Sequence, residues 1–322
     1  MNNLEQLFYR DDLKWLSKSI IYLCKYGSHA YGLNCETSDL DLRGICIPPV
    51  KFFIGYLDNF EQAEFKQDFD GVIYNIKKFF RLAADCNPSI IEQLFVDEED
   101  ILFCSEYGRK LLNIRHEFLS KKVKWTFGQY ASSQVKRVNA HRRWLRDESI
   151  MQKPTRGQFG LPEQNVLSAE IRGAAEKLEV VFSDNIMELL HREKQYAAAC
   201  REYENFLTWK KERNPKRAEI ERKIGYDGKH VSQLIRLYLM ATEILRNGEV
   251  RVKRPVEERE WLIGIKTGNT DWKFEDVMNF VNSKTEELDK LYETSTLPHT
   301  PNHKLLNDTL MDITLNYYDL IN

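Results

Sequence analysis

A glycine–serine pair and a pair of acids lie close together near the beginning of the sequence. Gly27-Ser28 follows the apolar run Ile20–Tyr26, and Asp39 and Asp41 come after ten further residues. Side chains alternate between the two faces of a strand, so a strand through this region would place both acids on one face. Adjacent carboxylates repel each other, and a divalent cation relieves that repulsion. Because Mg²⁺ prefers carboxylates together with substrate phosphates, the pattern indicates metal-assisted chemistry on a phosphorylated substrate.

The glycine–serine pair has the properties of a phosphate-binding turn. Glycine lets the backbone approach a polyphosphate closely, and the Ser28 hydroxyl and the following amides can donate hydrogen bonds to phosphate oxygens. Asp39 and Asp41 would bridge two Mg²⁺ ions, with Mn²⁺ as an alternative metal. One ion would orient the triphosphate of an NTP, and the other would lower the pKa of an attacking hydroxyl. Gly27 and Ser28 are therefore candidate nucleotide-binding residues.

A third carboxylate would complete this site and could act as the base. Asp70 stands at the entrance of the next apolar run and is the preferred candidate, with Asp68 as the alternative two residues earlier. Arg43 lies on the face of Asp41, where it would either contact a phosphate or pair with an aspartate.

The elements that must position these residues form the first third of the chain. Pro48-Pro49 ends the acid-bearing strand, because proline cannot donate to a ladder, and residues 52–69 read as irregular. A basic amphipathic helix follows Asp70–Ile76, and Pro88 begins another helix. We expect strands at Ile20–Tyr26, Leu40–Ile47 and Asp70–Ile76, with further strand segments at Leu94–Val96 and Ile101–Phe103.

The remainder of the chain is predicted to be helical. Apolar residues recur at helical spacing over residues 121–147, 165–183, 185–212 and 229–247. We therefore predict an α+β chain, with a catalytic domain over residues 1–112 and an all-helical domain over residues 113–322.

Composition and sequence features limit the classes of protein to which the chain can belong. The 322 residues are 42% hydrophobic and 30% charged, which is typical of a soluble globular protein. The first residues lack the features of a signal peptide, and no apolar run reaches the length of a membrane span. The six cysteines include no CxxC pair, and Pro301 lies between His299 and His303, which are therefore not expected to share a helix face or to bind zinc. These features predict a cytoplasmic protein without a membrane partner.

Several motifs together resemble the DNA polymerase β nucleotidyltransferase superfamily. They are Gly-Ser-His-Ala-Tyr-Gly at 27–32, Ser-Asp-Leu-Asp-Leu-Arg-Gly at 38–44, the strand of Asp70, Asn87-Pro88 before the helix of Glu92, and Gly-Tyr-Asp-Gly-Lys-His at 225–230. The chain is most similar to the predicted nucleotidyltransferases of bacteria and tailed phages, which include proteins associated with RNA-repair operons. Gly228 departs from the pattern, since a hydroxyl residue is expected there.

This resemblance implies a polymerase-β-like palm, a mixed sheet with flanking helices, followed by an all-α C-terminal domain. It also implies an Mg²⁺-dependent transferase that uses an NTP, with Gly27 and Ser28 for phosphate and with Asp39, Asp41 and Asp70 for metal. A phage-encoded member would work in the host cytoplasm. The resemblance does not imply an acceptor.

Two cationic regions could add substrate contacts. Residues 115–146 carry nine Lys and Arg against one acid, with aromatic residues interleaved, a composition that suits nucleic acid. The alternative is a buried aromatic stripe with a solvated basic face. Lys229, Gln233 and Arg236 share one helix face, which either closes over the triphosphate beside His230 or faces solvent. The candidate nucleic-acid residues are Lys124, Lys136, Arg137, Arg142 and Arg143.

The resulting hypothesis is transfer of a nucleoside monophosphate from an NTP to a hydroxyl, with release of pyrophosphate. RNA, either a tRNA or a broken RNA end, is the favoured acceptor. The alternatives are transfer of AMP to a protein hydroxyl, as in toxin–antitoxin pairs, and a non-catalytic fold that binds RNA or a nucleotide. The sequence does not give the oligomeric state.

Overall fold

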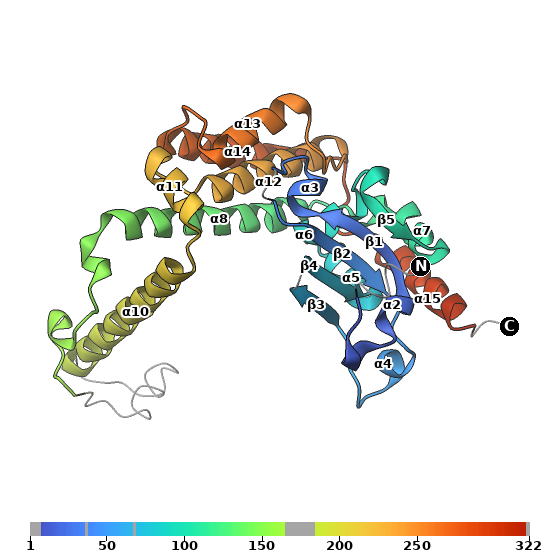
Figure 1. The fold of residues 1–322 in the computed structure, drawn as a ribbon, viewed down its shortest axis with the longest axis horizontal. Coiled ribbons are helices and arrows are strands. Elements are labelled where there is room, and N and C mark those ends of the chain that lie inside the picture. Colours follow the sequence, from blue (N-terminus) through green and yellow to red (C-terminus); the bar gives the residue numbers. More distant parts are fainter. Residues whose placement is uncertain (1–7, 36–37, 67–68, 165–183, 320–322) are drawn as a thin grey trace. The chain divides into compact units, whose positions relative to one another are not determined.

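The computed structural model describes residues 8–35, 38–66, 69–164 and 184–319 (Figure 1). Contacts divide the chain into two compact units, one formed by Met1–Val135 with Gly228–Asn322 and the other by Lys136–Asp227. The domain boundary predicted between residues 112 and 113 stays a prediction, because a division by contacts does not show which residues bind substrate.

A five-stranded mixed sheet forms the centre of the first unit. Its order is β3-β4-β2-β1-β5, in which β2 and β4 are parallel and the other neighbours are antiparallel. This sheet confirms the predicted α+β class. The strands are β1 (Ile20–Tyr26), β2 (Asp41–Cys46), β3 (Gln62–Lys66), β4 (Asp70–Asn75) and β5 (Ile101–Cys104).

Two of the sequence-based strand assignments were wrong. β3 lies in the segment read as irregular, although its side chains alternate, with Ala63 and Phe65 buried and Glu64 exposed. Leu94 instead ends helix α6, and the two residues that follow it are not in a strand.

One face of the sheet packs against the N-terminal segment. Leu23, Leu42 and Ile73, from three adjacent strands, share a buried cluster with Phe8 and Phe65. Burial of these apolar side chains is the main stabilising contribution on this face.

The other face carries helices. Asn75 ends β4 and caps α5, because its side chain accepts a hydrogen bond from the Lys77 amide. The Tyr22 hydroxyl donates to the Gln93 carbonyl of α6 at 2.7 Å. The helices near the sheet are α2 (Leu16–Ser19), α3 (Gly27–Ala30), α4 (Lys51–Ile54), α5 (Ile76–Ala84), α6 (Pro88–Leu94), α7 (Glu106–Asn113) and α15 (His303–Tyr317), with 3₁₀ turns at Asp11–Leu13, Glu98–Asp100 and Arg115–Phe118.

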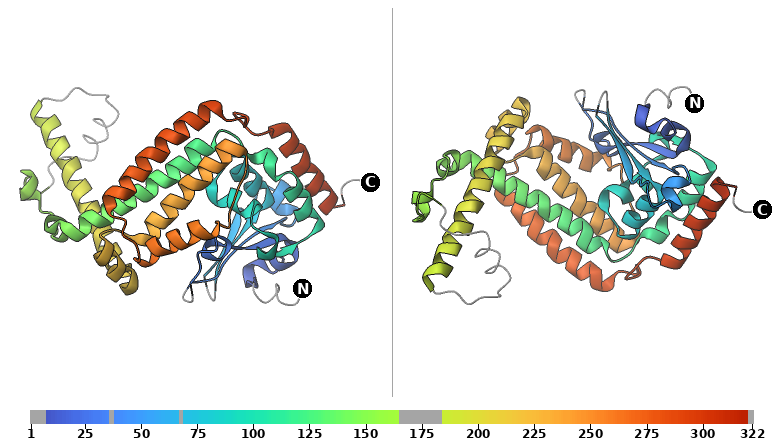
Figure 2. Two further views of the ribbon diagram at one scale, coloured as in Figure 1. Left: turned by 90° about the horizontal axis from the view of Figure 1, so that it is seen from above. Right: turned by 90° about the horizontal axis from the view of Figure 1, so that it is seen from below.

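A helical region completes the first unit, as predicted. α12 (Gly228–Asn247), α13 (Val256–Thr267) and α14 (Phe274–Thr294) lie side by side in Figures 1 and 2. Gly228 lies so close to α13 that a Cβ atom would approach the Ile265 carbonyl oxygen to 2.3 Å. This contact explains glycine at the position where a hydroxyl residue was expected.

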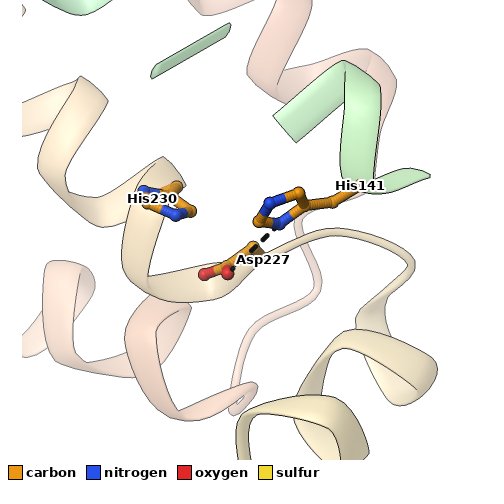
Figure 3. A group of neighbouring side chains, drawn as sticks. All are labelled: His141, Asp227 and His230. Atoms are coloured by element: carbon orange, nitrogen blue, oxygen red, sulfur yellow. Dashed lines mark ion pairs between the residues drawn. The ribbon is translucent and has the colours of Figure 1, made fainter. Parts of the chain in front are cut away.

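The second unit contains the end of α8 (Val123–Arg146), α10 (Asp184–Glu212) and α11 (Pro215–Ile224), with 3₁₀ turns at Glu148–Met151 and Arg156–Phe159. Trp144 of α8 packs on Trp209 of α10, with ring centroids 5.4 Å apart. His141 lies 3.7 Å from the Asp227 carboxylate (Figure 3). Part of the aromatic stripe in the basic segment is therefore packed, and the helix predicted over residues 165–183 lies outside the described residues.

A buried ion pair joins the sheet side of the first unit to its helical region. Arg236 of α12 donates to the Glu92 carboxylate of α6 at 2.6 Å, and both side chains are at most 1% exposed. The hydroxyls of Tyr26 and Tyr31 also donate to Glu92, at 2.8 and 2.6 Å. The guanidinium lies 3.6 Å from the centre of the Tyr31 ring. Although burial favours the neutral form of Arg236, the Glu92 carboxylate raises its pKa above the usual value.

Removing one member of this pair should strongly destabilise the protein. We expect Arg236→Met to lower the free energy of unfolding by about 3–5 kcal/mol, because it leaves a buried carboxylate without its cation. Urea unfolding followed by circular dichroism measures this change. The control is Asp312→Asn in an exposed pair with Lys110, which should change the unfolding free energy little. Equal effects of the two substitutions would contradict a structural role for the buried pair.

Candidate active site

The glycine–serine turn lies directly against one of the predicted metal-binding acids. β1 ends at Tyr26, and Gly27 turns the chain with a φ of +64°. A Cβ atom at Gly27 would lie 2.1 Å from the Asp41 carboxylate oxygen. Only glycine therefore satisfies both the backbone conformation and the close approach of the carboxylate.

Sheet register brings two of the acids together. Asp41 is the first residue of β2, and its Cα partners are Tyr26 on one side and Asp70 on the other. Asp39 is exposed and precedes the strand rather than lying in it. Asp70 is half-exposed at the start of β4. Asp68, the alternative third acid, lies outside the described residues.

The charges around Asp41 suit a divalent cation. Burial raises the pKa of the Asp41 carboxyl, and the charges of Asp70 and Asp39 add to this rise, whereas Arg43 and Lys229 oppose it. The ionised form of Asp41 is therefore less favourable than that of an isolated aspartate, and added positive charge would stabilise it. Carboxylate oxygens are hard ligands of the kind that Mg²⁺ and Mn²⁺ prefer, so Asp39, Asp41 and Asp70 fit such an ion.

Arg43 pairs with an aspartate, which was one of its two predicted roles. Its Nη1 atom donates to the Asp70 main-chain oxygen at 3.0 Å and lies 3.4 Å from an Asp70 carboxylate oxygen. The guanidinium also lies 5.0 Å from the centre of the Tyr26 ring. Arg43 thus holds the start of β4 against β2, and its contact with a phosphate stays a prediction.

The helix face predicted on α12 is exposed at Lys229 and buried at Arg236. Lys229 is exposed in the first turn, and its charge acts on Asp41. The His230 ring lies 2.9 Å from the Gln134 side chain. Arg236 does not join them, because it lies in the core against Glu92. Helical spacing correctly placed these residues on one helix. It could not indicate that the buried Glu92 carboxylate faces Arg236.

Sequence reasoning missed two cations of α13 that lie close to the segment following the glycine–serine turn. The Lys266 amino group donates to the Leu33 carbonyl at 2.8 Å, and burial lowers its pKa, with a further contribution from Lys229. Arg259 packs on Gly32, where a Cβ atom would lie 2.7 Å from the arginine Cδ. None of the motifs found in the sequence assigned a role to either residue, and α13 reaches Leu33 only through the tertiary structure.

The predicted nucleic-acid residues are divided between the two units. In the first unit, Lys124 pairs with Asp289 at 2.8 Å and lies 4.4 Å from the centre of the Trp125 ring. In the second unit, Lys136 and Arg137 are exposed. Arg142 and Arg143 line an open hollow of about 630 Å³ together with Asn139, Arg146, Asp147 and Ser149. Three arginine side chains thus line the hollow, a lining that suits phosphate oxygens, and one of them, Arg143, also pairs with Glu202.

Comparison with known proteins agrees with this geometry. Residues 2–155 match the family described as the RNA repair pathway DNA polymerase beta family. A phage T4 protein described as "Uncharacterized 38.9 kDa protein in nrdC-mobD intergenic region" is 24% identical over 314 residues, which cover 82% of this chain and 89% of the phage protein. No solved structure matches the chain. In the described part of the chain, no helix is both long enough and apolar enough to cross a membrane.

The matched segment contains the five-stranded mixed sheet, the glycine–serine turn and all three acids. A mixed sheet with flanking helices and a following helical region is the polymerase-β-like arrangement implied by the sequence. Residues 2–155 of this chain are therefore similar to the RNA repair pathway DNA polymerase beta family in both sequence and fold.

Proposed function

We propose that the protein is a divalent-metal-dependent nucleotidyltransferase that moves a nucleoside monophosphate from an NTP to a hydroxyl. The observation that carries this proposal is the register of Asp41 and Asp70 on adjacent parallel strands, with the backbone of Gly27 against the Asp41 carboxylate. This register supports the proposal, because it brings the glycine–serine turn and two acids to one end of the sheet.

Each group has a chemical role in this reaction. The Ser28 hydroxyl, Lys229 and Lys266 would bind the triphosphate, since all three lie in or beside the turn. Asp39, Asp41 and Asp70 would hold Mg²⁺ or Mn²⁺, which supplies positive charge at the phosphates and lowers the pKa of the attacking hydroxyl. The acceptor oxygen bonds to the α-phosphorus, the bond to pyrophosphate breaks, and the Asp70 carboxylate accepts the hydroxyl proton.

RNA is the proposed acceptor. The matched family carries RNA repair in its description, and the arginine-lined hollow of the second unit suits a phosphate backbone. Transfer of AMP to a protein hydroxyl is the alternative, and it would not need that hollow. A non-catalytic binding protein is disfavoured, because the acids and the phosphate turn are all present.

Replacing the central acids should abolish transfer. We expect Asp41→Asn and Asp70→Asn each to reduce the rate by at least about a hundredfold, because the metal contributes several kcal/mol of transition-state stabilisation. The measurement is incorporation of label from α-³²P-NTPs into acceptor. Asp58→Asn, in an exposed pair with Lys51, serves as the control and should retain activity. Full transfer by Asp41→Asn would show that the assigned site is wrong.

Removing divalent metal should have the same effect on the unmodified protein. We expect EDTA to stop label transfer and added Mg²⁺ or Mn²⁺ to restore it, because the three carboxylates repel one another without a cation. Circular dichroism in EDTA serves as the control and should show an unchanged fold. Undiminished transfer in EDTA would contradict a metal-dependent reaction.

The acceptor can be identified by supplying total RNA or total protein with the labelled NTPs. We expect labelled RNA, and we expect Arg142→Gln with Arg143→Gln to weaken RNA binding and to reduce its salt dependence, by a slope of about 0.7 for each lost phosphate contact. Lys211→Gln, an exposed cation of α10, is the matched control. Label on protein and none on RNA would favour the alternative reaction.

A further inference from the structure

A second hollow lies within the first unit, on the side of the sheet that carries α6. It has a volume of about 400 Å³ and is formed by the end of α5, the start of α6 and the first half of α8. This volume falls within the range of about 300–1,000 Å³ that is typical of small-molecule sites. The side chains used in the following argument are Asn87, Ser89, Gln129, Tyr130 and Ser133.

The lining has the chemistry of a nucleoside site rather than a phosphate site. None of the residues that line the hollow is a lysine or an arginine, and the acid Asp85 already pairs with Lys122 at 3.0 Å. Tyr130 is 38% exposed, and within the described part of the chain its ring contacts no other aromatic ring. Such a ring offers a surface on which a base can stack.

Two amides beside the ring can read the edge of a base. Asn87 stands at the N-cap of α6, but its side chain makes no capping hydrogen bond. Gln129 is exposed on α8, one residue before Tyr130. Each amide offers both donors and an acceptor, and the hydroxyls of Ser89 and Ser133 lie in the same hollow. A flat ring, amides and hydroxyls together suit a base and its ribose.

The hollow is also close to the proposed reaction. Ser89 lies one helical turn before Glu92 in α6, and the Tyr26 hydroxyl donates to the Glu92 carboxylate at 2.8 Å. Tyr26 is the cross-strand partner of Asp41, and its ring lies under the guanidinium of Arg43. Tyr26 therefore connects α6, whose first residues line the hollow, to the strand of Asp41.

We propose that this hollow is a nucleoside subsite, which binds the base and ribose of either the incoming NTP or the terminal nucleotide of the acceptor. The proposal rests on the proposed function for its position in the reaction. Its test does not require turnover, since nucleoside binding can be measured directly.

The test is equilibrium dialysis of the full-length protein with labelled ribonucleosides and their 5′-monophosphates, without metal. We expect at least one probe to bind at millimolar concentration, and Tyr130→Ala to weaken it about tenfold or more, because the stacking face is lost. Tyr130→Phe keeps the ring and should bind as the wild type does. Gln129→Ala should change the preference among bases.

Tyr56→Ala is the matched control, because Tyr56 is 94% exposed and does not line the hollow. Absence of binding by the wild type, or equal binding by wild type and Tyr130→Ala, would overturn the proposal. Either result leaves the transfer reaction to be judged by its own assay. Conversely, binding that depends on Tyr130 in a protein without transfer would support the subsite and refute the proposed function.

Steady-state kinetics separate the two sources of the nucleoside. If the subsite holds the NTP, Tyr130→Ala should raise the KM for the NTP and leave the KM for the acceptor unchanged. If it holds the acceptor, the KM for the acceptor should rise instead. A transferase whose two KM values are both unchanged in Tyr130→Ala would contradict the proposal.

Discussion

The Glu92–Arg236 ion pair is the interaction on which the site's geometry depends. A buried charge is tolerated only when it is paired and hydrogen-bonded, so the pair fixes the separation of α6 and α12. Tyr26 and Tyr31 bond the same carboxylate from either side of the phosphate turn. The glycine–serine turn, α6 and α12 are therefore held together through the Glu92 carboxylate. Helix α12 also carries Lys229.

The acids and the lysines of the site come from different parts of the chain. Together they suit a substrate that binds as a complex of a metal ion with an anion. Asp39, Asp41 and Asp70 belong to the sheet region, whereas Lys229 and Lys266 come from α12 and α13. The acids favour a metal and the lysines favour phosphates. A metal-bound triphosphate satisfies both sets at once, whereas a free cation or a free anion satisfies only one.

Local patterns predicted the elements of the site well, but they did not predict its long-range partners. β1 and β4 followed from apolar runs, and Asp70 followed from its position at a strand entrance. Arg236 was predicted to bind the nucleotide, because helical spacing identifies which residues share a helix face but not which residues pack against that face. Its partner Glu92 lies 144 residues earlier. Lys266 was missed for the same reason, since only tertiary structure brings α13 to Leu33.

The residues of the candidate site are brought together from distant parts of the chain by these long-range contacts. The three acids lie before residue 112, but the cation that neutralises Glu92 and the lysines beside the turn lie after residue 228. A fragment that ended near residue 112 would keep the three acids but would lose Arg236, the cation that pairs with the Glu92 carboxylate. Without α12 that carboxylate is exposed to water, which competes for its hydrogen bonds with the Tyr26 and Tyr31 hydroxyls on either side of the glycine–serine turn. The chemistry predicted from the first third of the sequence therefore depends on the helices at its other end.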